Sequence, residues 1–222
     1  MIIYFFKRLM PEKHTANNID ERVSQICEDY GLSIEKIPII SDSASNMKSA
    51  FKNNFWLPCM CHRLHTAITC AWNEVLEDPE IKLVYQKMLD VRAFVHKSSN
   101  KGSQLTKRLP NDTPTRPWCG LSQFFIAFDA SYDDLTRITE DSKVTMPTDR
   151  PLIREILKFF TIFDKPFESL QSTKNTSIYM VIIQIAAIFR KLNKLPDRLN
   201  VIKTAITKCI FYLYHKNVYV LT

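Results

Sequence analysis

The sequence predicts an α/β segment followed by an all-α segment, in a chain that is mostly helical overall. In the first half, short apolar runs rich in β-branched residues alternate with stretches of helical apolar spacing, whereas the second half keeps only the helical spacing. Only 3 of the 222 residues are glycine, which disfavours β architectures built on tight turns. Hydrophobic residues make up 45% of the chain, so one or two domains can each bury a core.

The first domain is expected over residues 1–110, where strands and helices alternate in the order β-α-β-α-β-α. Asn17 or Asn18 is placed to cap the first helix, and Gly31 is placed to end it. The expected strands are Met1–Met10, Ile37–Ile40 and Phe55–Met60, and the expected helices are Ile19–Tyr30, Ser43–Phe51 and His62–Leu76. Asp78 and Pro79 then mark the start of a further helix.

The second domain is expected over residues 111–222 and contains only helices. Polar composition predicts a loop over 98–117 and a linker over 139–151. The expected helices include Trp118–Leu135, Leu152–Phe163 and Ile178–Phe189. The last of these falls well short of the roughly 20 apolar residues that span a bilayer, so a core helix is expected there.

The net charge and the cysteine content indicate which binding partners and which cell compartment to expect. The net charge is +7 and the isoelectric point is near 9.1, which favours polyanionic partners, either nucleic acid or an anionic membrane surface. The 6 cysteines stand in a chain of this size without a secretory signal, so they are expected to be reduced thiols in the cytosol or nucleus.

An acidic residue, Asp42, directly follows the expected strand Ile37–Ile40 and precedes small polar residues that open a helix. Strand ends are where α/β sheets place ligand and metal sites, so Asp42 is a candidate site residue. The structural alternative is that Asp42 or Ser43 only caps the helix that follows.

Four residues with nitrogen or sulfur ligand atoms, Cys59, Cys61, His62 and His65, fall within seven positions. A structural zinc site usually takes two ligand pairs separated by a loop, and here both pairs come from one strand-to-helix junction. We therefore expect no zinc, and expect these side chains to serve packing or hydrogen bonding.

A basic stretch follows the helix that begins at Pro79, and it could track a phosphate backbone or form a solvated face. Arg116 and Trp118 lie beyond it, where the indole could stack on an unpaired base or anchor its own helix in the core. The candidate DNA-binding residues are Arg92, Lys97, Lys101, Lys107, Arg108, Arg116 and Trp118.

In their order along the chain, these pieces resemble the hAT superfamily of DNA transposases and its domesticated relatives, the BED-zinc-finger transposase-like proteins. The most specific resemblance combines an Asp-x-Ala-x-Asn-Met block with a Cys-x-x-His block. The matching residues are Asp42, Ala44, Asn46 and Met47, then Cys59 and His62. Weaker matches are His14-Thr15, then Phe94, Ser98 or Ser99 and Leu105, then Thr115, Arg116 and Trp118, and finally the helical stretch Ile156–Ser172.

The resemblance implies a partial RNase H-like core followed by a helical insertion domain. It makes Asp42 a catalytic metal ligand, the second member of an Asp-Asp-Glu triad, Cys59 and His62 a supporting motif, and Trp118 a contact at the DNA end. Two Mg²⁺ ions act in a complete site of this kind. The first Asp and the Glu have no counterpart in this sequence, so we expect the chain to be catalytically incomplete and to hold no Mg²⁺ by itself.

The function that follows from the resemblance is DNA binding by a transposase-derived, nuclear protein or fragment. DNA is the expected partner, full-length transposase-like proteins or a second copy of the chain are further candidates, and no membrane partner is expected. The alternatives are a non-catalytic nuclear protein-interaction module and a transposon remnant without a function.

Overall fold

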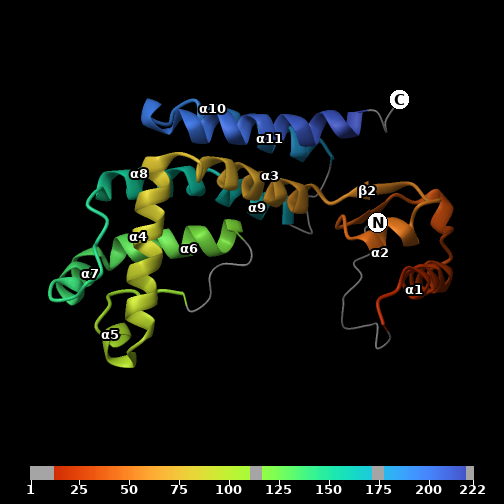
Figure 1. Ribbon diagram of the computed structural model, residues 1–222. Helices are drawn as coiled ribbons and strands as arrows, with labels where there is room; N and C mark the ends of the chain where they lie inside the picture. Colours follow the sequence, from red (N-terminus) through yellow and green to blue (C-terminus); the bar gives the residue numbers. More distant parts are fainter. Residues whose placement is uncertain (1–12, 111–116, 172–177, 219–222) are drawn as a thin grey trace. The chain divides into compact units, whose positions relative to one another are not determined.

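The computed structural model describes residues 13–110, 117–171 and 178–218 (Figure 1). These residues are mostly helical, with two short strands in one parallel sheet in the first part of the chain, which confirms the expectation of an α/β segment followed by helices. The chain divides into two compact units, Met1–Arg63 and Leu64–Thr222. None of the described helices is long and apolar enough to cross a membrane.

The first unit contains a β-α-β arrangement preceded by a helix. Its elements are α1 (Ala16–Asp29), η2 (Ile34–Lys36), β1 (Ile39–Ser41), α2 (Ser45–Ala50), β2 (Trp56–Pro58) and the first turn of α3 (Met60–Val75). The predicted helices and the second and third predicted strands are confirmed with shifted or shorter bounds. The predicted strand Met1–Met10 lies outside the described residues.

Helix α1 begins at a different cap from the one predicted. Thr15 is the N-cap, and its hydroxyl accepts a hydrogen bond from the Asn18 backbone N–H at 3.3 Å. The prediction of Asn17 or Asn18 as cap is wrong because both lie inside the helix, where Asn18 instead donates its side-chain amide to the Lys13 carbonyl. Gly31 ends α1 as predicted, at a φ of 67° that favours glycine.

The sheet pairs β1 and β2 in parallel, with Ile40 opposite Leu57, and α2 connects them. Ile39 packs into a core with residues of α1 and with Phe51, which ends α2. Ile40 points to the other face and is 61% exposed, so the strand expected from the apolar run Ile37–Ile40 is buried on one face and not on the other. The physical reason is that neighbouring strand residues alternate between faces, and only one face carries the core of this unit.

The described residues of the second unit form helices and no strand, and from α4 onward these are α-helices, which Figure 1 labels, and the short 3-10 helix η3, which it does not label. They are α4 (Pro79–His96), α5 (Ser99–Ser103), α6 (Pro117–Ala130), α7 (Tyr132–Thr139), α8 (Arg150–Thr161), α9 (Asp164–Gln171), α10 (Ile178–Leu192), η3 (Asp197–Leu199) and α11 (Asn200–Val218). The start of α4 is confirmed, because the Asp78 carboxylate accepts hydrogen bonds from the Glu80 and Ile81 N–H groups at 3.0 and 3.1 Å.

Aromatic side chains from several helices form the centre of this unit. Trp72 of α3 lies with its ring 5.4 Å from those of Tyr85 and Phe160 and 5.8 Å from that of Phe125. Such contacts contribute about 0.5–1.5 kcal/mol per pair beyond the burial of apolar area. The predicted apolar face of α8 is buried as expected, and α8 packs against α6.

Two predictions fail in this unit. The helix expected over Trp118–Leu135 is broken at Ser131 into α6 and α7, and the loop expected over 98–117 contains the short helix α5. Ser131 is 1% exposed and its hydroxyl bonds to the backbone of Lys107, a contact that no local pattern can indicate. The residues of α5 are polar and include Gly102, so no apolar periodicity marks them as helical.

Candidate functional site

The basic segment of residues 92–110 is the feature of the second unit that best fits a polyanion. It contains five lysines and arginines and no acidic residue. Arg92 lies on α4, Lys101 lies on α5, and Lys107 and Arg108 lie in the loop that follows α5. The segment therefore concentrates positive charge on one short stretch of chain.

The end of this segment is fixed to α4. The carbonyl oxygen of Pro110 accepts hydrogen bonds from Arg92 Nε and from His96 Nε2, both at 2.9 Å. A carbonyl oxygen only accepts, so Nε2 is the protonated ring nitrogen of His96. Leu109 is 1% exposed and anchors the loop by its side chain. These contacts hold the end of the loop against the last turn of α4.

The middle of the loop is fixed to α7 and to the residue before it. The Ser131 hydroxyl accepts a hydrogen bond from the Lys107 N–H at 2.8 Å and donates one to the Lys107 carbonyl at 2.9 Å. The Asp134 carboxylate accepts from both the N–H and the hydroxyl of Thr106, at 2.8 and 2.7 Å. The Thr106 hydroxyl is the main cause that holds the pKa of Asp134 below its usual value.

The five cations of the segment fall into two groups. Arg92 bonds to the Pro110 carbonyl, and the Lys101 ammonium lies 3.4 Å from the centre of the Phe94 ring, so these two have structural contacts. Lys97, Lys107 and Arg108 are exposed, and none of them forms an ion pair with another residue of the described part of the chain. We call Lys97, Lys107 and Arg108 the basic loop surface.

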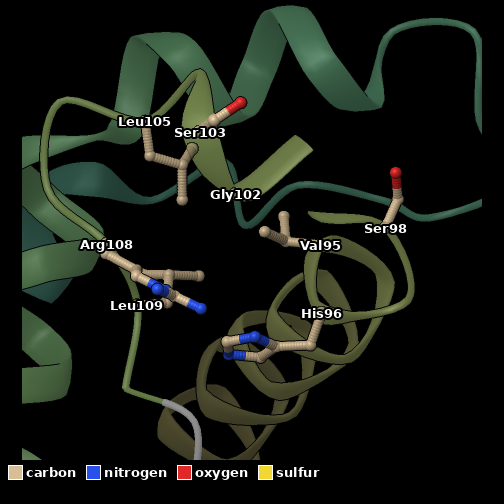
Figure 2. A pocket seen from close by; sticks show the side chains of 8 residues that line it. All are labelled: Val95, His96, Ser98, Gly102, Ser103, Leu105, Arg108 and Leu109. Atoms are coloured by element: carbon tan, nitrogen blue, oxygen red, sulfur yellow. The ribbon is translucent and has the colours of Figure 1, made fainter. Parts of the chain in front are cut away.

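A hollow of about 530 Å³ lies between the end of α4 and the loop, next to this surface (Figure 2). In Figure 2 the side chains of His96 and Arg108 point toward one another across it. Its lining residues are Val95, His96, Ser98, Gly102, Ser103, Leu105, Arg108 and Leu109. The hollow thus combines two nitrogen-bearing side chains with hydroxyls and apolar side chains.

The remaining predicted DNA contacts cannot be placed beside this surface. Arg116 lies outside the described residues, and so does the side chain of Trp118, whose backbone belongs to the first turn of α6. Both stay predictions. The structure thus describes five of the seven sequence-predicted DNA-binding side chains, with Arg92 bonded to the Pro110 carbonyl at the end of the loop and Arg108 lining the hollow.

In the first unit, Asp42 directly follows β1, as the sequence suggested. Its carboxylate accepts a hydrogen bond from the Ala44 N–H at 3.0 Å, in the turn that leads into α2. The N-cap of α2 is Ala44, so neither Asp42 nor Ser43 is the cap itself. The Asp42 carboxylate is exposed and occupies the end of a strand of the parallel pair.

The other motif residues of the first unit have local structural contacts. Asn46 donates its side-chain amide to the His14 carbonyl at 3.0 Å and so ties α2 to the chain before α1. Cys59 directly precedes α3, and its N–H donates to the Ser41 carbonyl at 2.7 Å. His62 lies in the first turn of α3 and is exposed. Asp42 and Cys59 therefore follow neighbouring strands at the same edge of the sheet.

Metal ligands are sparse in what the structure describes. Within residues 13–110, 117–171 and 178–218, no group of three or more His, Cys, Asp or Glu side chains is placed to hold a metal ion. Mg²⁺ requires several well-placed oxygen ligands, and Asp42 belongs to no such group among the described residues. The two-metal site that the resemblance implies, and its expected incompleteness in this chain, stay predictions.

Sequence reasoning missed the residues that position the basic loop surface. Ser131 and Asp134 are 24 and 28 residues beyond their partners Lys107 and Thr106, so only the folded chain brings them together. His96 lies in the basic stretch of the sequence, but its position facing Arg108 in the hollow depends on the folded chain.

Comparison with known proteins adds no relative. No protein-family model matches the chain, and no curated protein matches it.

Proposed function

We propose that this chain is a non-catalytic DNA-binding protein, or part of one, derived from a hAT-type transposase. The observation that carries the proposal is the basic loop surface, in which Lys97, Lys107 and Arg108 extend from a backbone fixed by hydrogen bonds. Exposed cations without an ion-pair partner are available to displace the counterions of DNA. A fixed backbone lowers the entropy lost when they bind.

The derivation from a transposase is supported by the first unit. The parallel pair of β1 and β2 with α2 between them is the type of connection that an RNase H-like core contains. Asp42 follows the first strand of the pair and Cys59 the second, so the two motif blocks lie at the ends of neighbouring strands. The proposal therefore assigns this unit to a partial RNase H-like core.

The lack of catalysis in this proposal follows from the count of oxygen ligands. A two-metal reaction needs carboxylates on rigid neighbouring elements, and Asp42 is the one motif carboxylate that this sequence supplies. Its hydrogen bond to Ala44 fixes the turn before α2 and gives it a structural role as well.

The experiment is a binding titration of a fluorescently labelled DNA duplex at low salt with the purified chain. The triple variant Lys97→Glu, Lys107→Glu, Arg108→Glu should lose more than about tenfold in affinity, because it replaces three phosphate-binding cations by repelling carboxylates. The matched control is Lys158→Glu, Lys165→Glu, Lys194→Glu, which changes the net charge equally at exposed lysines elsewhere in the second unit.

The control separates a local surface from overall charge. If both triple variants lose affinity equally, the basic loop surface is not the binding site. If the unmodified chain fails to bind duplex DNA at low salt, the proposal is wrong. In that case the exposed Ile182 and Ile183 of α10, at 63% and 52%, favour the protein-interaction alternative.

A further inference from the structure

We propose that the hollow beside α4 binds one phosphodiester of a DNA strand together with the deoxyribose attached to it. This inference rests on the proposed function and names the part of the DNA that the site takes. The hollow holds about 530 Å³, which lies within the roughly 300–1,000 Å³ of ordinary ligand pockets. It is larger than a bare phosphate requires, so it has room for the sugar as well.

The polar lining of the hollow suits an anion. Arg108 and His96 point toward one another across it, and none of the described residues that line it is acidic (Figure 2). A guanidinium binds a phosphate through two parallel N–H donors. His96 Nε2 is already bonded to the Pro110 carbonyl, so the other ring nitrogen, Nδ1, faces the ligand and donates a hydrogen bond to a phosphate oxygen when the ring is the imidazolium cation. Ser98 adds a hydroxyl at the edge.

The apolar lining suits the carbon skeleton of a sugar. Leu105 is half-buried and offers apolar surface to the hollow, whereas Val95 and Leu109 line it with little free surface, each being 1% exposed. A surface that binds phosphates by charge alone needs no such residues. Their presence next to Arg108 gives the hollow one polar and one apolar part, as a phosphodiester with its deoxyribose requires.

The hollow is held open by the same contacts that fix the loop. The Pro110 carbonyl binds His96 Nε2. The Ser131 hydroxyl binds the N–H and the carbonyl of Lys107, the residue before Arg108. Because these bonds exist without a ligand, binding need not order the loop, and that lowers its entropic cost.

Gly102 offers a test that changes no charge. It lies in α5 and lines the hollow, and a Cβ added there meets no atom within 4 Å. We expect Gly102→Trp to fill the hollow and to lower the affinity for duplex DNA about tenfold, as Arg108→Gln should, because a charge-assisted hydrogen bond is lost in both. Gly102→Ala is the control and should stay within about twofold, since one methyl group leaves most of the hollow open.

A second measurement follows the His96 ring by NMR while inorganic phosphate, a deoxynucleoside monophosphate or a DNA oligonucleotide is added to the full chain. We expect the nucleotide and the oligonucleotide to shift the His96 signals in the unmodified chain and in Gly102→Ala, but not in Gly102→Trp. A shift by inorganic phosphate alone would mean that the site takes a free anion, and the deoxyribose part of the inference would be wrong.

The outcomes separate the inference from the proposed function. If Gly102→Trp binds DNA as well as Gly102→Ala does, while the Lys97, Lys107, Arg108 triple variant loses affinity, the inference is overturned and the proposed function stands. If the chain binds no DNA but the nucleotide still shifts His96, the proposed function is overturned and the hollow is a nucleotide site. If no probe shifts His96, the inference is overturned.

Discussion

The buried hydroxyl of Ser131 binds both backbone hydrogen-bonding groups of Lys107, accepting from its N–H at 2.8 Å and donating to its carbonyl at 2.9 Å. Ser131 is 1% exposed and stands between α6 and α7. One side chain thus replaces the two partners that a neighbouring strand would offer to Lys107. The Lys107 side chain therefore extends into solvent from a backbone that these two hydrogen bonds hold in place.

Replacing Ser131 by alanine should therefore destabilise the second unit and weaken DNA binding together. The change leaves the N–H and the carbonyl of Lys107 without their partner, which costs about 1–3 kcal/mol where such groups are buried. Urea unfolding gives the free energy, and the duplex titration gives the affinity. The exposed Thr145→Ala is the control. A Ser131→Ala protein with unchanged stability would show that the contact does not fix the loop.

Asp129 should make stability depend on pH. Burial acts to raise its pKa, but hydrogen bonds from Arg150 and Arg154, at 2.9 and 3.0 Å, hold the pKa below its ordinary value. The stability from this carboxylate is therefore fully present above the unfolded value of about 3.9 and is lost as pH falls through the lower folded value.

The variant Asp129→Asn tests this. It should lower the free energy of unfolding by about 1–3 kcal/mol at pH 7, because it weakens two charge-assisted hydrogen bonds. The difference from the unmodified chain should shrink once the pH is below the folded pKa of Asp129, where the carboxyl itself is protonated. Urea unfolding at pH 7 and at a pH below the folded pKa of Asp129 measures this difference in stability. Asp141→Asn, at an exposed residue, is the control. A difference that grows on acidification would contradict the assignment.

Gly31 should tolerate no side chain, in contrast to Gly102. Its φ of 67° lies in the left-handed region, so Gly31→Ala should destabilise the first unit by about 1–2 kcal/mol even though a Cβ there meets no atom within 4 Å. Gly102→Ala should be neutral or slightly stabilising, because Gly102 is helical. Thermal or urea unfolding of both variants checks this. If Gly31→Ala is as stable as Gly102→Ala, Gly31 does not end α1 in the left-handed conformation.

Cys209 should react more slowly than Cys70 with an alkylating agent. Burial is the main cause that raises the pKa of the Cys209 thiol, and the nearby Cys70 and Glu74 raise it further. Cys70 is exposed on α3. Because the thiolate is the reactive form, we expect modification of Cys209 to be about tenfold slower at pH 8. Mass spectrometry of timed digests measures both rates, and faster reaction at Cys209 would contradict the placement of α11.

The parts of the fold that sequence predicted are those with local causes. The start of α4 follows from Asp78 and Pro79, and the end of α1 follows from Gly31, because each acts on backbone groups within a few residues. The cap of α1 was mistaken because three neighbouring residues, Thr15, Asn17 and Asn18, are all suitable caps. Which of them caps is decided by where the helical backbone begins.

The sequence predicted which cations make up the candidate site but not how they are arranged. The cations of residues 92–108 were visible in the sequence, whereas their division into structural and exposed groups depends on Phe94, Pro110 and Ser131. The hollow forms because α5 and the loop after it pack against the end of α4. No local sequence pattern indicates this tertiary contact. The exposure of Ile40 could not be predicted either, because a short apolar run does not show how many faces of a strand are covered.

The salt dependence of DNA binding tests the central claim most directly. If Lys97, Lys107 and Arg108 each contact one phosphate, a plot of the logarithm of the association constant against the logarithm of salt concentration should have a slope of about −2.7. The association constant should then fall about 40-fold between about 50 and 200 mM salt. The variant Lys97→Gln, Lys107→Gln, Arg108→Gln should bring the slope close to zero. A slope that is the same in the variant and in the unmodified chain would contradict the account.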